Sequence, residues 1–343
     1  MSFWALVEKG KPLQAWEHLA EPSGANTVRV QVAGCGLCHT DIGFMFSEVP
    51  TRKALPVVLG HEISGTVLDG PLAGQQVLVP AVMPCGQCAA CRAGYERTCP
   101  HQIMPGNDVH GGFGPWIEVP QSALVPLPQM ISPTELAQFA VIADAVTTPL
   151  QAIHNLGLAT HDVAIVIGCG GVGSFACLLA KARGAFVIAM DIDDNKLEKM
   201  KGLGIDETLN TRGLSFKDIK GFVKSVCQKN DWPAFGHRIL ETSGSKIGQE
   251  TAFGLLSMAA RMAVVGFTLD KVEVRLSNLM AFDAQVIGNW GASPSIYPEA
   301  IEIALTGALH LDQMTRLEPL QNINSIIENV HHHGTDRRVV FTP

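Results

Sequence analysis

A glycine-rich turn between an apolar run and a helical pattern constrains the fold of this chain more than any other feature. Val163 to Ile167 is a short apolar run typical of a buried strand, and a helical pattern extends from Val172 to Arg183. Between them, glycines permit a tight turn, close approach of a pyrophosphate and close helix packing. The candidate pyrophosphate-binding residues are Gly168, Gly170, Gly171, Val172 and Gly173. An ordinary buried βα turn is the alternative.

The strand after this helix ends in an acidic residue, Asp191, 18 residues past Gly173. A carboxylate at this position can accept hydrogen bonds from both hydroxyls of a ribose, and it repels a 2′-phosphate. The segment Asp191-Ile192-Asp193-Asp194 contains no arginine that would bind such a phosphate. The sequence therefore favours NAD over NADP.

Around this turn, apolar strand-like runs alternate with helical patterns, which predicts a parallel sheet covered on both faces. The strand-like runs are Val163 to Ile167, Phe186 to Met190, Arg238 to Leu240 and Met262 to Val265, and the helix candidates are Val172 to Arg183, Lys196 to Leu203, Phe216 to Gln228 and Ile247 to Leu256. Residues 1 to about 144 instead show short alternating runs between Gly and Pro turns, typical of a β-rich domain of barrel type. A chain of 343 residues also favours two domains.

Composition excludes several classes of function. The net charge is −7, whereas a nucleic-acid or anionic-membrane partner would favour a basic face. The N-terminus reaches Glu8 before any long apolar run, and no stretch has the roughly 18 apolar residues of a membrane span. We therefore expect a cytoplasmic protein with a small-molecule substrate.

Four of the nine cysteines, Cys85, Cys88, Cys91 and Cys99, lie within 15 residues of one another. Four thiolates at such spacing can close a tetrahedral shell around one Zn²⁺, which leaves no position for a substrate. Free or disulfide-paired cysteines are the alternative, and a long chain without a secretion signal disfavours it. The sequence predicts a structural zinc site.

A second, open metal site is predicted from residues that are spread over the first domain: Cys38, His61, Glu62 and Asp144. A catalytic zinc needs three or four protein ligands and an exchangeable water, and a thiolate, an imidazole and a carboxylate meet that need. Taken singly, each residue could instead be an ordinary buried polar group or a small buried thiol.

Taken together, these motifs resemble the zinc-dependent alcohol dehydrogenases of the medium-chain dehydrogenase/reductase family. The resemblance covers essentially the whole chain and rests on Cys38-His39-Thr40-Asp41, Gly60-His61-Glu62, the four cysteines, the glycine-rich turn and Arg338-Val339-Val340. It implies an α/β protein with a GroES-like catalytic domain (1–144 and 288–343) and a Rossmann NAD-binding domain (145–287), with the active site between the domains.

The resemblance also implies a role for each site residue. Cys38, His61 and Asp144 would bind the catalytic zinc, and Glu62 would be a nearby carboxylate that ligates transiently. Thr40 would be the first proton-relay hydroxyl, and Asp41 would orient His61. The implied cofactor contacts are His39 and Arg338 at the pyrophosphate, Thr148 at the nicotinamide and Lys196 at the ribose. Gly43 departs from the family pattern, because many members have a relay histidine there.

The substrate is less constrained by the sequence. Ala81 lies where the family often has a bulky pocket residue, which favours a larger or cyclic alcohol. Arg52 and Lys53 could receive a phosphate-bearing group, although an ordinary exposed basic pair is equally consistent. Within the family, the sequence most resembles dehydrogenases that act on a cyclic alcohol carried on a coenzyme A thioester.

Three alternative functions remain open, and so does the oligomeric state. The alternatives are a general secondary-alcohol or polyol dehydrogenase, a zinc-free quinone or enoyl reductase, which would lack these ligands, and a non-catalytic NAD-binding sensor. The family also implies a homodimer or homotetramer, with a strand near Val286 to Trp290 as the candidate interface.

Overall fold

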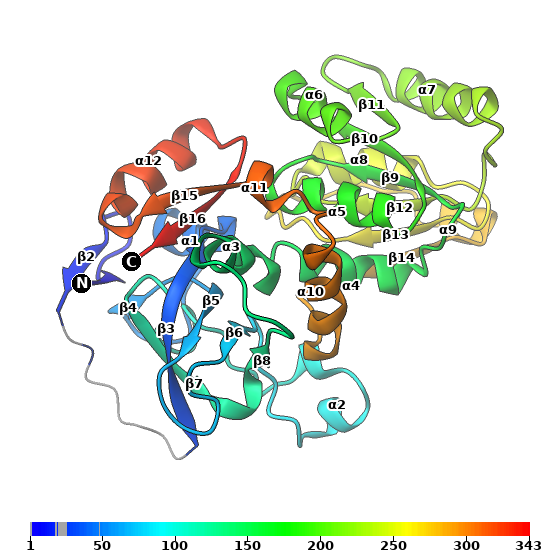
Figure 1. Ribbon diagram of the computed structural model, residues 1–343. Coiled ribbons are helices and arrows are strands. Elements are labelled where there is room, and N and C mark those ends of the chain that lie inside the picture. The colour runs from blue at the N-terminus through cyan, green and yellow to red at the C-terminus, as the bar shows by residue number, and fades with distance from the viewer. Residues whose placement is uncertain (1, 18, 20–25, 48) are drawn as a thin grey trace. The chain divides into compact units, whose positions relative to one another are not determined.

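The computed structural model describes residues 2–17, 19, 26–47 and 49–343. It divides into two compact units: unit 1 comprises residues 1–147 and 291–343, and unit 2 comprises residues 148–290. The predicted borders, 144/145 and 287/288, each lie three residues before the borders between the units. In Figure 1 the first part of the chain (blue and cyan) and the last part (orange and red) share unit 1, while the green and yellow segment forms unit 2.

Unit 1 is built on β-sheets. Over its described residues, a seven-stranded sheet has the order β15-β16-β3-β5-β6-β8, with β7 paired to β3, and a smaller sheet has the order β2-β1-β4. The strands are β1 (Phe3–Leu6), β2 (Gln14–Trp16), β3 (Thr27–Gly36), β4 (Val57–Val58), β5 (Glu62–Val67), β6 (Gln76–Val79), β7 (Trp116–Pro120), β8 (Val125–Pro126), β15 (Thr315–Pro319) and β16 (Arg338–Thr342). Among the named strands of the described part of unit 1, β15 and β16 pair in parallel and the other pairs are antiparallel. The sheet therefore joins the two ends of the chain, because β16 pairs with β3.

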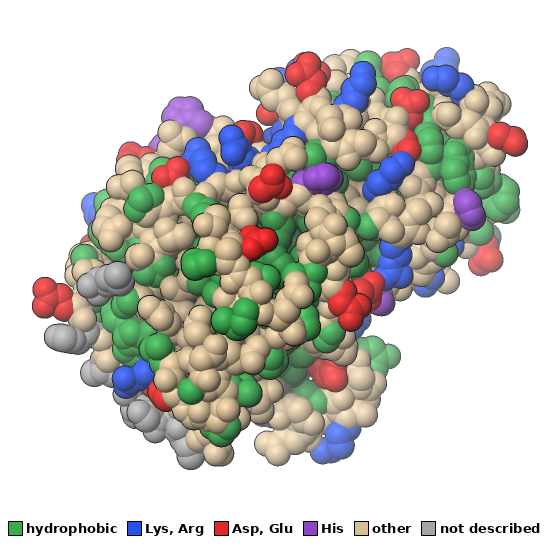
Figure 2. Space-filling model, viewed as in Figure 1, with side chains coloured by type: hydrophobic (Ala, Val, Ile, Leu, Met, Phe, Trp, Pro, Cys, Tyr) green, Lys and Arg blue, Asp and Glu red, His purple; other side chains and the backbone are tan. Residues whose placement is uncertain are grey.

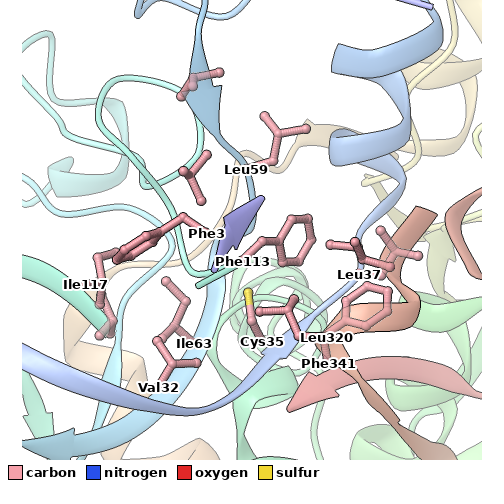
Figure 3. Packing of buried hydrophobic residues seen from close by; sticks show 14 of the residues in the cluster. Phe3, Val32, Cys35, Leu37, Leu59, Ile63, Phe113, Ile117, Leu320 and Phe341 are labelled. Carbon is pink, nitrogen blue, oxygen red and sulfur yellow. The ribbon is translucent and has the colours of Figure 1, made fainter. Parts of the chain in front are cut away.

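Alternating side chains of these strands form the core of unit 1. In β3, Val28, Val30 and Val32 are buried at every second position, as expected for a strand with one face against a core. Figure 3 shows how residues from distant segments meet there, with Phe113 beside Phe341. The rings of Phe113 and Phe341 pack edge to face, with centroids 5.5 Å apart.

The helices of unit 1 have between four and eleven residues. They are α1 (His39–Phe46), α2 (Ala89–Arg92), α3 (Pro133–Gln138), α10 (Tyr297–Leu305), α11 (Leu311–Met314) and α12 (Ile323–His333), with 3-10 turns η1 (Glu96–Thr98), η2 (Gln121–Ala123), η3 (Phe139–Ala143), η4 (Pro294–Ile296) and η5 (Leu320–Asn322). The sequence analysis did not predict α1, although this helix carries candidate site residues.

Unit 2 contains a six-stranded parallel sheet in the order β11-β10-β9-β12-β13-β14, counted over the residues that the structure describes. Its strands are β9 (Val163–Ile167), β10 (Phe186–Asp191), β11 (Glu207–Asn210), β12 (Arg238–Glu241), β13 (Arg261–Val264) and β14 (Gln285–Gly288). The strand order reverses between β9 and β12, and ligands bind at such switch points, beyond the carboxyl ends of the strands. Strand β11 was not predicted, because it is short and three of its four residues are polar.

Four of the six connecting helices of unit 2 match predicted helices, and the first and the last of the six were not predicted. The six helices are α4 (Thr147–Leu156), α5 (Gly171–Ala182), α6 (Asp194–Gly202), α7 (Phe216–Lys229), α8 (Lys246–Gly254) and α9 (Ser277–Phe282). Helix α7 begins at a capping box in which Ser215 Oγ accepts from Asp218 N over 3.3 Å and Asp218 Oδ2 accepts from Ser215 N over 3.1 Å. Its buried residues recur at helical spacing and pack on the sheet: Ile219, Val223, Val226 and Cys227.

Two further observations concern the charge on the surface and the hydropathy of the helices. On the faces visible in Figure 2, acidic and basic side chains are interspersed and no large basic area is present. Among the described residues, no single helix is long and apolar enough to cross a membrane; one bent pair, Pro133–Ala143 with Thr147–Leu156, meets the test by length and composition only.

Candidate active site

Four side chains that are far apart in the sequence lie together in unit 1. Cys38, His61, Glu62 and Asp144 each offer a ligand atom, and these atoms lie within 4.8 Å of one another. Asp144 Oδ2 is 3.7 Å from Cys38 Sγ and 3.6 Å from His61 Nε2. The structure thus gathers the four residues that the sequence predicted around a catalytic metal.

These separations fit a single small cation. Zinc binds sulfur at about 2.3 Å and nitrogen or oxygen at about 2.0–2.2 Å, so ligand atoms in a tetrahedral shell lie roughly 3.3–3.8 Å apart. The two measured separations, 3.6 and 3.7 Å, fall in this range. A thiolate, an imidazole and a carboxylate at these positions could hold zinc and leave the fourth position of the shell open.

The electrostatics of the group favour a positive charge at the same place. Burial alone lowers the pKa of the His61 imidazole, but the carboxylates of Asp41 and Asp144 outweigh burial and raise that pKa well above its usual value. Without a metal, the site would draw a proton onto His61. A divalent cation beside Nε2 would supply the positive charge instead.

Asp41 links the metal ligands to the start of α1. Its Oδ2 accepts from the backbone N–H of Cys38 over 3.0 Å, and its Oδ1 accepts from the N–H of Gly60 over 3.0 Å. Oδ1 also lies 3.6 Å from His61 Nδ1, which is longer than a hydrogen bond but close for opposite charges. One buried carboxylate therefore holds the backbone beside two predicted ligands and faces the imidazole, as its predicted role requires.

Glu62 and Arg338 form a buried ion pair next to these ligands. Arg338 Nε donates to Glu62 Oε2 over 3.1 Å, and Arg338 Nη2 donates to Glu62 Oε1. Burial raises the pKa of the Glu62 carboxyl, and Arg338 opposes that shift. The sequence predicted a pyrophosphate contact for Arg338 and transient metal ligation for Glu62, but it did not predict that the two residues pair with each other. They are 276 positions apart.

Gly36 makes room for the ion pair, and the sequence analysis missed it. In the sheet, Gly36 of β3 lies opposite Glu62 of β5, and a Cβ atom on Gly36 would be 2.0 Å from Glu62 Oε2. Any side chain there would therefore displace the carboxylate. A signal was present, because glycine within a strand pattern often marks a close approach.

The four remaining predicted ligands, Cys85, Cys88, Cys91 and Cys99, form a second group. Their sulfur atoms are 3.5 Å apart in the pairs Cys88–Cys91 and Cys85–Cys99, 3.6 Å in Cys88–Cys99 and 4.0 Å in Cys85–Cys91. A tetrahedral Zn–S₄ shell has S–S separations of about 3.8 Å.

Backbone groups around these sulfurs also favour thiolates. The N–H groups of Gln87 and Cys88 lower the pKa of the Cys85 thiol to about 6. Burial, by contrast, raises the pKa of Cys91, so four adjacent thiolates need a cation to neutralise them. The group fits a structural zinc.

In unit 2 the glycine-rich turn has the predicted geometry. Gly168 has φ +90°, and a Cβ on Gly173 would lie 1.7 Å from Gly168 O, so α5 can pack closely on the turn only because position 173 is glycine. Nothing lies within 4 Å of a Cβ placed on Gly170, the N-cap of α5. The open N-terminus of α5, which begins at Gly171 and Val172, could bind a pyrophosphate.

Asp191 ends β10 beside this turn. Its Oδ2 accepts from Cys169 N over 2.6 Å, and its Oδ1 accepts from the N–H groups of Ile192 and Asp193 over 2.7 and 3.0 Å. These backbone bonds hold the carboxylate at the carboxyl edge of the sheet, where the ribose is predicted. Lys196 lies half-buried on α6, five residues farther along.

The structure adds an arginine that the sequence analysis did not associate with this position. Arg212, just past β11, donates from Nε and Nη2 to Ile192 O over 3.1 and 3.0 Å. For the prediction against a 2′-phosphate, only the segment from Asp191 to Asp194 was considered, which contains no arginine. The parallel pairing of Asp191 with Asn210 brings Arg212 to the same edge.

The other residues predicted to contact the cofactor or to relay the proton lie on helices α1 and α4. His39 is exposed at the start of α1, and Thr40 Oγ1 is 3.6 Å from Cys38 Sγ. Thr148 is buried in α4, and its carbonyl accepts from Asn289 Nδ2 over 3.2 Å.

The predicted substrate residues have different neighbours. Ala81 is buried, and its N–H donates to the Tyr297 hydroxyl over 3.1 Å. Arg52 is 57% exposed and pairs with Asp108 over 3.3 Å, while Lys53 N donates to Asn107 O over 2.7 Å. The two basic residues thus belong to a surface segment anchored on Asn107 and Asp108.

Comparison with known proteins agrees with both units. A family described as alcohol dehydrogenase GroES-like domain matches residues 24–129, and one described as zinc-binding dehydrogenase matches residues 171–306. These matches, with the observed sheets, confirm the predicted fold class: a GroES-like domain and a Rossmann-type parallel sheet.

Several relatives match along most of their length. An L-threonine 3-dehydrogenase of Rhizobium johnstonii is 30% identical over 80% of this chain and 81% of its own length. An alcohol dehydrogenase of Geobacillus stearothermophilus is 28% identical over 98% of both chains. The crystal structure of Escherichia coli galactitol-1-phosphate dehydrogenase is 25% identical and covers 100% of both chains, with a TM-score of 0.89. The chain therefore belongs to the zinc-type medium-chain alcohol dehydrogenase family, enzymes that act on CH–OH groups.

Proposed function

We propose that this zinc-dependent alcohol dehydrogenase uses NAD⁺ to oxidise a cyclic allylic alcohol carried on a CoA thioester. The proposed substrate is 6-hydroxycyclohex-1-ene-1-carbonyl-CoA, an intermediate of anaerobic benzoyl-CoA breakdown, and the product is its 6-oxo derivative. The observation that carries the reaction class is the group formed by Cys38, His61 and Asp144, whose ligand-atom separations of 3.6 and 3.7 Å suit one zinc. The substrate rests on the resemblance of the whole sequence to 6-hydroxycyclohex-1-ene-1-carbonyl-CoA dehydrogenase.

The residues of this chain divide the chemistry between them. When bound, zinc polarises the alcohol oxygen and lowers the pKa of its hydroxyl group, and NAD⁺ accepts the hydride from the carbinol carbon. Cys38, His61 and Asp144 would hold the zinc. Arg338 binds the Glu62 carboxylate, which would keep Glu62 from being a permanent ligand. Thr40 Oγ1, 3.6 Å from Cys38 Sγ, is the hydroxyl proposed to pass the proton outward.

Beyond Thr40, water is proposed to complete the proton path. Gly43 has no side chain that could carry the proton, and nothing lies within 4 Å of the position that its Cβ would occupy. This open space suits a solvent molecule.

NAD is the proposed dinucleotide because Asp191 presents a carboxylate at the predicted ribose position. We predict that Asp191→Asn shifts the ratio of kcat/KM for NADP⁺ over NAD⁺ by about tenfold or more, since a repulsion of roughly 1–4 kcal/mol at about 4 Å is removed. Asparagine retains the acceptor for Ile192 N and Asp193 N. Arg212, which donates to Ile192 O at the same edge, is the basic side chain proposed to meet the 2′-phosphate. Initial rates with each cofactor measure the ratio.

Asp193→Asn is the matched control for this test. It removes the same charge two residues away, where the side chain caps α6 by accepting from Asn195 N over 2.9 Å. An unchanged cofactor ratio in Asp191→Asn, or an equal shift in Asp193→Asn, would contradict the assignment of Asp191.

The substrate is tested by assaying NAD⁺ reduction with a panel of cyclic hydroxyacyl-CoA thioesters and the matching free alcohols. A preference for the thioesters supports the proposal, and Arg52→Ala should then raise KM for the thioesters alone. Arg97→Ala is the control, because it removes an arginine from η1, beside the four cysteines. Faster turnover of free alcohols or polyols would favour the second candidate, a general secondary-alcohol or polyol dehydrogenase.

The second candidate is supported by the relatives themselves. Their names specify threonine and galactitol 1-phosphate, which are small polar alcohols rather than thioesters. The same assay panel therefore decides between the two substrate classes.

We further propose that the chain forms a homodimer or homotetramer through the β14 edge of unit 2. Val286 on β14 is 37% exposed, and nearby Trp290 and Met280 are 57% and 80% exposed. An edge strand with such neighbours favours pairing with another chain. Val286→Lys should lower the mass measured by light scattering to that of a monomer, whereas Leu68→Lys, at another exposed apolar residue, should not. An unaltered mass in Val286→Lys would exclude this edge.

A further inference from the structure

We infer that the hydroxyl group of Tyr297 positions the metal ligand Asp144, and that Tyr297 is therefore a positioning residue for the catalytic zinc site. This inference rests on the metal-dependent function proposed above. Tyr297 is the first residue of α10, 153 positions after Asp144, and neither the sequence motifs nor the resemblance assigned it a role.

The Tyr297 side chain is buried at 1% exposure, so its hydroxyl must find partners within the protein. It donates to Ala143 O over 2.5 Å and accepts from Ala81 N over 3.1 Å. Burial raises the pKa of the phenol, so it remains a neutral donor. All three residues belong to unit 1.

The accepting carbonyl explains why this contact bears on the metal. Ala143 O belongs to the peptide group whose nitrogen is that of Asp144, and a peptide group is planar. A hydrogen bond that fixes the carbonyl therefore also fixes the direction in which the Asp144 Cα, and hence its carboxylate, is presented. Asp144 has φ −142° and ψ −58°, outside the helical and extended ranges, so no regular ladder of hydrogen bonds holds it.

A second hydroxyl reinforces the same carbonyl. Thr147 Oγ1 donates to Ala143 O over 3.2 Å, so this one oxygen accepts from two buried side chains. The hydrogen bond from Tyr297 to Ala143 O is shorter than the one from Thr147. The Tyr297 hydroxyl also accepts from the backbone N–H of Ala81. The hydroxyl thus ties the peptide before a metal ligand to a candidate substrate residue.

Tyr297→Phe removes the hydroxyl and retains the ring. Groups that orient metal ligands typically contribute tenfold to a hundredfold to metal affinity, so we expect the affinity of the Cys38 site to fall by about tenfold or more. The probe is Co²⁺, titrated into the metal-free full chain in competition with a chelator. The Co²⁺ absorption band that is absent in Cys38→Ala identifies the site.

Thr315→Val is the matched control, because Thr315 is buried in unit 1, its hydroxyl donates to Leu311 O over 2.6 Å, and it belongs to neither metal group. It should lose stability without losing Co²⁺ affinity at the Cys38 site. Thr147→Val removes the second donor to Ala143 O, a hydroxyl that also contacts the Tyr297 side chain, and it leaves the Tyr297 bond to Ala143 O in place, so it should weaken Co²⁺ binding less than Tyr297→Phe. This variant also keeps the inference testable if Tyr297→Phe does not fold.

The outcomes separate the inference from the proposed function. A wild-type chain that binds no Co²⁺ through Cys38 overturns both. A wild-type site whose affinity and Co²⁺ spectrum are unchanged in Tyr297→Phe overturns the positioning role alone, as does an equal loss in Thr315→Val. A selective loss in Tyr297→Phe, with a smaller loss in Thr147→Val, supports it.

Discussion

Replacement of Cys38 by alanine is expected to lower kcat/KM for alcohol oxidation by about a thousandfold or more. The variant removes one of three ligands whose atoms lie within 4.8 Å of one another. The metal contributes several kcal/mol of transition-state stabilisation, and each ~1.4 kcal/mol is a factor of ten in rate. His61 and Asp144 alone should hold zinc weakly. Initial-rate kinetics measure the loss, and metal analysis should show zinc falling from about two to about one per chain.

Cys35→Ala is the control for this loss. Cys35 is also buried, three residues before Cys38, but it belongs to neither metal group. It should retain two zinc ions and most of the activity. Near-normal rates in Cys38→Ala, or an equal loss in Cys35→Ala, would show that Cys38 is not a ligand.

Replacement of Cys99 by alanine should mainly destabilise the protein. Cys99 Sγ is 3.5 Å from Cys85 Sγ and 3.6 Å from Cys88 Sγ, so its loss opens the four-sulfur shell on two sides. Structural zinc contributes folding free energy directly, and we expect unit 1 to lose about 4 kcal/mol or more. Apart from α2 and η1, few regular hydrogen bonds hold residues 84–101.

Limited proteolysis and metal analysis check this prediction. Cleavage within residues 84–101 should become fast in Cys99→Ala, while one zinc should remain at the Cys38 site. Cys35→Ala again serves as the control, since it removes a buried thiol from the same unit. A Cys99→Ala protein as resistant as the wild type would contradict a structural metal.

The sequence predicted those parts of the site that depend on local chemistry. The turn from Gly168 to Gly173 was recognisable because both positions require glycine. Gly168 has φ +90°, and a Cβ atom at Gly173 would lie 1.7 Å from Gly168 O. The four cysteines were recognisable because their ligand spacing is short. In both cases the functional atoms come from one continuous segment.

The contacts between distant segments were missed. Arg338 was expected at a pyrophosphate, but it forms an ion pair with Glu62, because β16 and β5 flank β3 and Gly36 leaves room between them. Arg212 reaches Ile192 because β11 pairs with β10. Strand β11 was not predicted, so the position of Arg212 beside Ile192 could not be predicted either.

The sequence by itself therefore determined the fold class and predicted which side chains gather in the two groups that could hold a metal, because glycine geometry, hydrophobic periodicity and ligand chemistry are local properties. Only the tertiary structure decided how those side chains are held. Asp41 faces His61, Arg338 pairs with Glu62, and Tyr297 holds the peptide before Asp144. These partners come from segments that only strand pairing and core packing bring together, and no local pattern encodes such long-range contacts.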